Sequence, residues 1–301
     1  EGRMNYEEFI IEILKIVKMR LGENYDVMCK DIIKNNSCVF KSMYITDRYA
    51  DGHGMVTPAI YLEYWYERYQ QGDKVDDIAD KLLDIYYKSA DRVKGFDVSS
   101  ISGDNVEESV FYRLVNYEAN REQLENVPYI PFLDLAVTFH YCCSVEDRSV
   151  NSFRINDRLM KAWGLVIDDL FGYAENNMQE MFPDVLTTLD SVIQRFAGLD
   201  RELPDIPGKI YILTNTYGVN GAAALLYTTK LHMLAVKLDS DLYIIPSSVH
   251  ELLIVPVQSG INGDEIKELV KEVNYSYVLK EERLSDNVYI FHKDSGEIDI
   301  Y

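Results

Sequence analysis

The first part of the chain alternates between helical and extended hydrophobic patterns. Apolar residues at helical spacing predict a first helix that Asn5 can cap and Gly22 can end. Two β-type runs, 26–33 and 38–46, stand on either side of a Lys-Asn-Asn-Ser turn signal. Because strands joined by such a turn pair antiparallel, these runs predict a hairpin.

Aromatic residues dominate the next helical pattern. Thr57-Pro58 is a typical helix start, Gly72 ends the pattern, and Asp73 can cap a second helix directly after it. The short link predicts an antiparallel helix pair. The aromatic residues of the first helix are Tyr61, Tyr64, Trp65, Tyr66 and Tyr69. Such a stripe can stack nucleic-acid bases, but on an acidic chain this spacing is more typical of a core with an amphipathic rim.

The middle of the chain combines strands with helices. Extended patterns predict strands at 110–117, 133–143 and 150–155, and the third should pair back on the second. Asn156 can cap a helix that carries the next apolar stripe. A further helix is expected over 184–197.

A hairpin signal and a short helix follow. Apolar runs at 209–217 and 222–227 flank Asn220-Gly221. Asn-Gly between apolar runs is the strongest short hairpin signal, because both residues tolerate positive φ. A short helix is expected over 228–238.

The most regular stretch lies near the end of the chain. Two apolar β-type runs, 242–245 and 252–257, enclose a polar corner. We expect them to form buried strands at the centre of the C-terminal part. After a loop, Asn262 can cap a helix, and the runs 288–291 and 297–300 predict a last hairpin.

Together these elements predict an α+β protein in which helices are interleaved with antiparallel hairpins. The links between strands are too short for the crossovers of a parallel sheet. Residues 95–105 and 199–208 have the composition of linkers. We therefore expect two lobes that share an interface, an N-terminal α+β lobe over 4–197 and a C-terminal α+β lobe over 199–301.

Composition and charge narrow the functional classes. The chain has 301 residues, 47% of them hydrophobic, so it can bury a substantial core. Its formal net charge of −20 disfavours direct nucleic-acid binding, because phosphate backbones would be repelled. The simpler interpretation of this charge is an ordinary acidic, soluble cytosolic protein, and the sharper alternative is a DNA mimic that occupies a basic groove on a protein partner. No membrane span and no secretory signal are evident, so a cytoplasmic protein is expected.

The cysteines and histidines offer little metal chemistry. Cys29, Cys38, Cys142 and Cys143 are too few for a disulfide framework, and we expect buried, reduced thiols. His140 and Cys142 share one face of their strand, but two ligands are too few for a zinc site. The chain also lacks the motifs of phosphate loops and dinucleotide sites. No cofactor and no metal are expected.

The polar corner between the two buried runs concentrates side chains suited to nucleophilic catalysis. Ser247 or Ser248 could serve as nucleophile, His250 as base and Glu251 as the group that orients the base. Alternation places Ser248 and His250 on one face but turns Glu251 away. A catalytic arrangement therefore needs a remote carboxylate, such as Asp134 in an apolar run. The alternative is a turn that ends one strand and begins the next.

Four segments, taken together, resemble a known family. They are Pro-Ala-Ile-Tyr-Leu-Glu at 58–63, Asn-Tyr-Glu at 116–118, Phe-Leu-Asp-Leu-Ala at 132–136 and Pro-Ser-Ser-Val-His-Glu at 246–251. The chain is similar over nearly its whole length to an uncharacterised family, a domain of unknown function, of gut Clostridia-type Firmicutes. Ala59 stands where that pattern has threonine, a change that would not disturb a helix start. The resemblance implies one familial architecture and a bacterial, cytoplasmic setting. It implies no activity.

Two functional hypotheses follow from the sequence. The first is a non-catalytic interaction or regulatory module whose acidic surface engages a basic partner. The alternative is a hydrolase-like enzyme that uses His250 with Ser247 or Ser248 and a remote carboxylate, for which Glu63 and Glu118 are candidates besides Asp134. Contact between the His250 ring and one of these groups would favour the enzyme.

Overall fold

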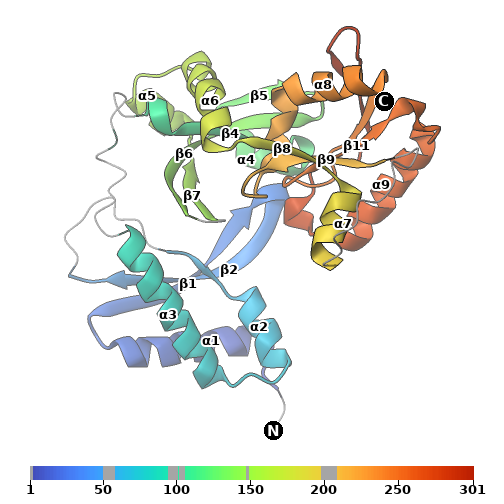
Figure 1. Ribbon diagram of the computed structural model, residues 1–301. Coiled ribbons are helices and arrows are strands. Elements are labelled where there is room, and N and C mark those ends of the chain that lie inside the picture. The colour runs from blue at the N-terminus through green and yellow to red at the C-terminus, as the bar shows by residue number, and fades with distance from the viewer. Residues whose placement is uncertain (1–2, 50–57, 94–100, 102–105, 147–148, 198–208) are drawn as a thin grey trace. The chain divides into compact units, whose positions relative to one another are not determined.

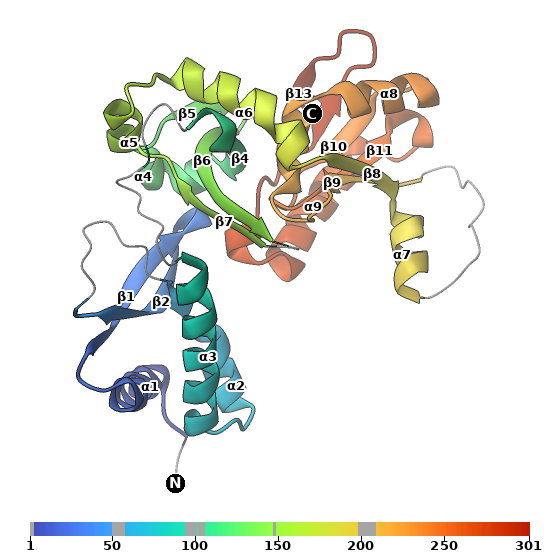
Figure 2. The ribbon, with the colours of Figure 1, turned by 60° about the vertical axis from the view of Figure 1, so that its left-hand side comes forward.

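The chain divides into two compact units, each described separately below (Figures 1 and 2). Unit 1 comprises residues 1–34 and 38–102, and unit 2 comprises residues 35–37 and 103–301. The computed structural model describes residues 3–49, 58–93, 101, 106–146, 149–197 and 209–301.

This division differs from the expected lobes, 4–197 and 199–301. Both sides of the expected boundary contribute strands to one sheet of unit 2, as shown below. The linker expected at 199–208 lies outside the described residues, and so does nearly all of the one expected at 95–105.

Unit 1 packs helices on an antiparallel sheet. Along the chain its elements are α1 (Tyr6–Leu21), β1 (Tyr25–Lys34), β2 (Cys38–Asp47), β3 (Ile60–Tyr61), α2 (Glu63–Gln70) and α3 (Val75–Val93). The strand order is β1-β2-β3. β1 pairs with β2 over their full lengths, which confirms the expected hairpin.

The first helix shows how the sequence sets the local structure of unit 1. The side chain of Asn5 accepts the Glu8 N–H at 3.0 Å, and the Glu8 carboxylate accepts the Asn5 N–H at 2.9 Å, which closes a capping box. Gly22, with a φ of 81°, ends the helix. The core beneath contains Phe9, Ile13, Val17, Met43, Ile45, Ile78 and Leu82.

The helix expected to begin at Thr57-Pro58 begins later. Ile60 and Tyr61 pair with β2 as strand β3, and α2 starts only at Glu63. Thr57 lies outside the described residues. Pairing with a neighbouring strand thus outweighs the helix-start signal at this position.

The aromatic stripe of α2 takes part in packing. The rings of Tyr66 and Tyr69 lie 5.5 Å and 5.4 Å from the ring of Phe9 on α1, whereas Tyr64 is 57% exposed. Two of the five rings that could stack bases therefore pack against another helix of the same unit.

The first sheet of unit 2 has four strands. They are β4 (Val110–Asn116), β5 (Tyr129–Phe132), β6 (Leu135–Glu146) and β7 (Ser149–Arg154). β6 pairs antiparallel with the other three, so the expected return of 150–155 onto this strand is confirmed. β5 has no counterpart in the sequence prediction, and Pro131 within it is typical of an edge strand.

Helix α6 (Ile167–Met181) covers one face of this sheet (Figure 1). Leu170, Ala174 and Met178 are its buried residues, and the ring of Phe171 stacks on that of Tyr112 at 6.2 Å. Asn156 caps a separate short helix, α5 (Asp157–Ala162), as expected, but the apolar stripe expected on that helix continues on α6, so one predicted helix is two. Further short helices are η1 (Asn35–Ser37), η4 (Glu107–Ser109), η5 (Glu118–Asn120), α4 (Arg121–Leu124), η7 (Val257–Ser259) and η8 (Lys280–Glu282).

The second sheet of unit 2 has six antiparallel strands. They are β8 (Asp184–Thr188), β9 (Tyr211–Asn215), β10 (Leu242–Ile245), β11 (Leu252–Pro256), β12 (Tyr289–Phe291) and β13 (Ile298–Ile300), in the order β13-β12-β10-β11-β9-β8. The two runs singled out in the sequence, β10 and β11, are its inner strands, which confirms the expected structural centre. The last hairpin, β12–β13, is confirmed as well.

Helix α9 (Gly263–Tyr277) packs on this sheet. Ile266 and Val270 join Tyr243, Val255 and Val288 in one hydrophobic cluster. The side chain of Asn262 caps the helix by accepting the Asp264 N–H at 3.0 Å. Antiparallel sheets covered by helices make this an α+β fold, as the sequence predicts.

Two local predictions for unit 2 are wrong in part. The helix expected over 184–197 begins as strand β8, and only α7 (Leu189–Ala197) is helical. Residues 184–188 are rich in Val and Thr, and they pair with β9. Both features favour a strand over a helix here.

The Asn-Gly pair does not make a hairpin. Asn220 has the positive φ that was expected, 53°, but Gly221 opens the 3₁₀ helix η6 (Gly221–Leu226) in place of a second strand. Residues 221–225 are all buried, so tertiary packing overrides the local turn signal. Helix α8 (Thr229–Leu238) follows as expected.

Candidate functional site

The polar corner between β10 and β11 is held by a neighbouring loop. Ser248 forms a β-bridge with Arg283, the Val249 N–H donates to the Glu282 carbonyl at 2.8 Å, and the Leu284 N–H donates to the Ser247 carbonyl at 3.1 Å. Ser248 is 9% exposed. The corner is therefore a buried turn with most of its backbone groups satisfied.

The ring of His250 contacts a backbone amide and a carboxylate. Its Nδ1 accepts the Asn220 N–H at 3.2 Å, and its Nε2 lies 3.5 Å from Glu282 Oε1. The hydroxyl of Ser248 instead accepts the backbone N–H of His250 at 3.0 Å. Glu251 is exposed. The structure thus brings Ser248 and His250 together through the backbone, and the expected bond between hydroxyl and ring is not formed.

At the corner, the backbone of residues 249–250 also lies very close to β9 and to the start of η6. The Thr214 hydroxyl donates to the His250 carbonyl at 2.7 Å, and the Ala222 N–H donates to the Val249 carbonyl at 3.2 Å. A Cβ added to Gly221 would lie 2.6 Å from the His250 oxygen. These contacts explain the corner as a structural joint between β9, η6 and β11.

Asp134 follows Leu133, which has a φ of 54°, in the turn from β5 to β6. Its Oδ2 accepts from the Ser285 hydroxyl at 2.6 Å and from the Asn287 amide at 3.0 Å, and its Oδ1 accepts from the Tyr289 hydroxyl. Tyr289 is fully buried, and burial followed by the charge of Asp134 raises the pKa of its phenol.

Asp134 therefore ties the four-stranded sheet to the segment that leads into β12. Its hydrogen-bond partners differ from those of His250, which are Asn220 and Glu282. The partner that a part-buried carboxylate needs is thus supplied by neutral donors. No signal in the sequence around Asp134 points to Ser285, Asn287 and Tyr289.

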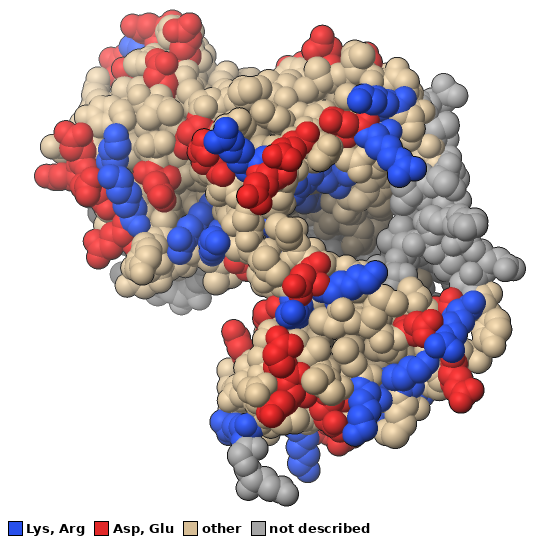
Figure 3. Space-filling model, turned by 180° about the vertical axis from the view of Figure 1, so that it is seen from behind, with Lys and Arg blue, Asp and Glu red and all other residues tan. Residues whose placement is uncertain are grey.

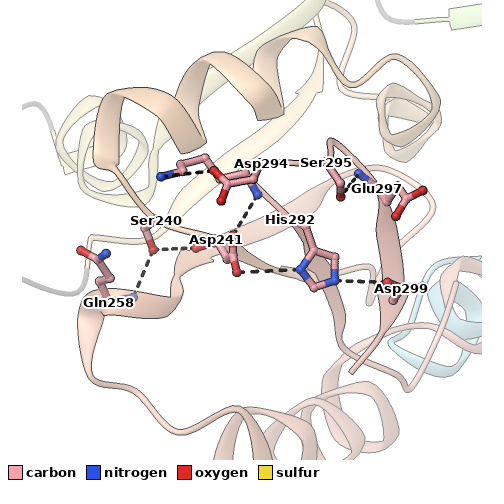
Figure 4. A network of polar contacts seen from close by, with 9 residues as sticks. Ser240, Asp241, Gln258, His292, Asp294, Ser295, Glu297 and Asp299 are labelled. Atoms are coloured by element: carbon pink, nitrogen blue, oxygen red, sulfur yellow. Dashed lines mark hydrogen bonds and ion pairs between the residues drawn. The ribbon is translucent and has the colours of Figure 1, made fainter.

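A second polar cluster involves His292, just after β12 (Figure 4). Its Nε2 lies 3.1 Å from Asp299 Oδ2, and its Nδ1 lies 3.8 Å from Asp241 Oδ2. Asp241 also accepts the Lys293 N–H at 2.8 Å. The serines drawn nearby, Ser240 and Ser295, bond to backbone groups. The cluster fixes the β12–β13 hairpin against the start of β10.

Metal chemistry gains no support from the described residues. In the part of the chain that the structure describes, no group of His, Cys, Asp and Glu side chains could hold a metal ion. The expectation of buried thiols is wrong for Cys143, which is exposed, because the pairing of β6 with β7 shifts register between Cys142 and Ser144. Cys38 is buried.

The outer face of α9 has a different character from all these clusters. Leu269 and Tyr275 are 58% and 82% exposed. They line a shallow, open depression together with Asp264, Glu265, Glu268, Lys271 and Glu272. Lys271 pairs with Glu268 at 3.0 Å, so three of the four acids have no such partner along this face among the described residues. Large apolar side chains inside an acidic rim are typical of an interaction surface.

The helix and its cap at Asn262 are predicted from the sequence, but the character of its outer face is not. The signal for the outer face was present, since Glu265, Leu269 and Glu272 are spaced four and three residues apart. Figure 3 shows that acidic and basic side chains are interspersed over the face it presents.

Comparison with known proteins gives one match. A model of a family of unknown function, DUF5688, matches residues 6–293. No curated protein and no solved structure matches the chain. No helix in the described parts of the chain is both long and apolar enough to span a bilayer.

Proposed function

Since this chain belongs to DUF5688, a family of unknown function, we propose from its own residues that it is a non-catalytic interaction module that binds a basic partner through the outer face of α9. The observation that carries this proposal is the pair Leu269 and Tyr275, exposed within the acidic rim of α9. A regulatory role and a bacterial, cytoplasmic setting belong to the same proposal.

The chemistry of this face defines the partner. Two large apolar side chains supply area whose burial is favourable. Asp264, Glu265 and Glu272, which have no basic partner among the described residues, favour lysine or arginine at the rim. Charges at the rim mainly increase the association rate and the specificity. The matching partner is an amphipathic segment with an apolar stripe between basic residues.

No contact in the described residues favours the alternative of a hydrolase. The ring nitrogens of His250 contact a backbone amide and Glu282, and the Ser248 hydroxyl accepts from the backbone. A base must reach the proton it removes, and here both ring nitrogens are engaged elsewhere.

The test uses a fluorescein-labelled amphipathic peptide of leucine and lysine, with binding followed by fluorescence anisotropy. We expect saturable binding that weakens as salt is added. The triple variant Glu265→Gln, Leu269→Ser, Glu272→Gln should bind at least about tenfold more weakly, because it removes an apolar anchor and two charges.

A matched control separates this face from overall charge. Asp77→Asn with Asp84→Asn removes two exposed acids from α3 in unit 1 and should leave the affinity unchanged. Equal weakening by both sets of changes would mean that the peptide responds to net charge alone, and the α9 proposal would then be abandoned. Unchanged binding by the triple variant would have the same consequence.

A further inference from the structure

One face of the four-stranded sheet carries a strip of basic and polar side chains. The register places Phe111 opposite His140 and His140 opposite Arg154, so these three share a face. Residues two positions along a strand return to the same face, which adds Arg113, Thr138, Cys142 and Ser152. This strip, named here the β6 strip, contains two arginines and a histidine in a chain with 50 acidic and 30 basic residues.

The guanidinium of Arg113 lies along this strip. It is 5.1 Å from the ring centroid of Phe111, and one of its terminal nitrogens donates to the Ser152 hydroxyl at 2.8 Å. Its Nε is buried and has no hydrogen-bond partner in the described parts of the chain. A buried donor without a partner costs free energy, and a charged one costs more.

His140, at the centre of the β6 strip, is 6% exposed. Its Nε2 lies 3.2 Å from the Thr138 hydroxyl. Burial, and after it the charges of Arg113 and Arg154, hold the pKa of His140 well below its usual range. Two guanidinium groups therefore lie close to one neutral imidazole.

The arginines of the strip have no carboxylate partner among the described residues. Burial, together with the charge of Arg154, lowers the pKa of Arg113 to about 10, and only the Cys142 thiol, not a carboxylate, acts in the opposite direction. Arg20, Arg48 and Arg68 all pair with aspartates. Arg113 and Arg154 differ from these arginines, because they are part-buried near each other without a carboxylate partner in the described residues.

We propose that the β6 strip is a binding site for a phosphate group, held between Arg113 and Arg154. Two fixed positive charges are balanced by one dianion, whereas a carboxylate or chloride would balance only one. Guanidinium groups present paired donors that match phosphate oxygens, and the buried Nε of Arg113 is a donor without a partner among the described residues. The Ser152 hydroxyl already lies in hydrogen-bond contact with Arg113 and adds a neutral partner.

The surroundings limit what else the ligand can carry. A small cavity beside Arg113, lined also by Val150, Asn215 and Asn220, has a volume of about 10 Å³, room for roughly one water molecule. Ser152 and Arg154 keep intermediate exposure. Any group esterified to the phosphate must therefore extend past β7, away from that cavity.

The experiment measures thermal unfolding of the full chain in a phosphate-free buffer, to which low millimolar sodium phosphate, acetate or chloride is added at constant ionic strength. Phosphate should raise the melting temperature, and acetate and chloride should not. A ligand at a hundred times its dissociation constant raises the folding equilibrium constant about a hundredfold. Titration calorimetry should give one phosphate per chain. Inorganic phosphate and glycerol phosphate are compared to distinguish a free phosphate from a phosphate ester.

Three variants decide the outcome. Arg113→Met and Arg154→Gln should each abolish the rise caused by phosphate, and Arg113→Met should melt no lower than the wild type without phosphate, because a lone buried charge is removed. Arg121→Gln, in an exposed pair with Glu118, should keep the full rise. The proposal would be overturned if phosphate left the melting temperature of the wild type unchanged. It would also be overturned if phosphate raised the melting temperatures of Arg113→Met and Arg154→Gln as much as that of the wild type. The second arginine variant serves if the first does not fold.

Discussion

Gly221 lies so close to the carbonyl oxygen of His250 that a Cβ at this position would be 2.6 Å from it. The same Cβ would be 2.2 Å from the Thr214 hydroxyl oxygen and 2.7 Å from the Asn215 nitrogen. Two of these three atoms belong to the backbone, and displacing backbone costs more free energy than displacing the end of a flexible side chain. The polar corner thus depends on a glycine that belongs to another segment.

Gly221→Ala should therefore destabilise the protein. Overpacking of a close-packed site costs about 1–3 kcal/mol, and the contacts here place the loss at the upper end of that range. Urea unfolding followed by circular dichroism measures the change. Gly172→Ala in α6 is the matched control, because a Cβ there meets nothing within 4 Å. That change should stabilise slightly, by about 0.5–1 kcal/mol. Equal effects of the two changes would contradict the steric account.

Asp134→Asn tests whether this carboxylate is a structural tie. Both of its oxygens accept hydrogen bonds from donors, so the amide group of asparagine would face a donor without an acceptor. We expect a loss of about 1–3 kcal/mol in the free energy of unfolding.

A double-mutant cycle with Tyr289→Phe supplies the control for Asp134. The two residues share a hydrogen bond, so the double variant should lose less stability than the sum of the single variants. The exposed Asp77→Asn should cost little. Additive losses for Asp134 and Tyr289 would contradict a shared role.

The sequence predicted those parts of the fold in which local pattern and burial agree. The runs that became β10 and β11 are apolar on both faces. Such a pattern is sufficient to predict an inner strand of a sheet that is covered on both sides. The capping box of α1 is likewise complete within four residues. These features need no partner from elsewhere in the chain.

The sequence predictions are wrong where a segment distant in the chain determines the local structure. Ile60 becomes a strand residue because Met43 offers a pairing partner, and Gly221 starts a 3₁₀ helix because of Thr214 and His250. For the candidate site, proximity of Ser248 and His250 could be predicted from alternation. The partners that occupy the ring, Asn220 and Glu282, could not, because they come from other loops.

Cys143 should react with a soluble alkylating reagent before the buried Cys38, although burial and the neighbouring Cys142 raise the pKa of the Cys143 thiol to about 11. It lies exposed at the register shift of the β6–β7 pairing, whereas Cys38 is buried. Mass spectrometry of the folded protein treated with iodoacetamide should show modification at Cys143 well before Cys38. Early modification of Cys38 would contradict the burial described for it.

The neutral His140 should make stability depend on pH. Its pKa in the folded chain is depressed by burial and by Arg113 and Arg154, so it lies below the value of about 6.5 for an unfolded histidine. Between these two values the unfolded chain binds a proton that the folded chain does not. The free energy of unfolding must then fall as the pH is lowered through about 6.5, by at most about 1.4 kcal/mol per pH unit.

His140→Gln removes this titration while it keeps a polar group beside Thr138. The free energy of unfolding of the variant, measured in phosphate-free buffer, should therefore fall less than that of the wild type between about pH 7 and pH 5. His292→Gln is the comparison, because its ring is part-exposed beside Asp241 and Asp299 and lacks the arginine neighbours. Taking the difference between wild type and variant cancels the contributions of the other histidines. Parallel curves for the wild type and His140→Gln would mean that His140 titrates alike in the folded and unfolded chains, contrary to its burial between two guanidinium groups.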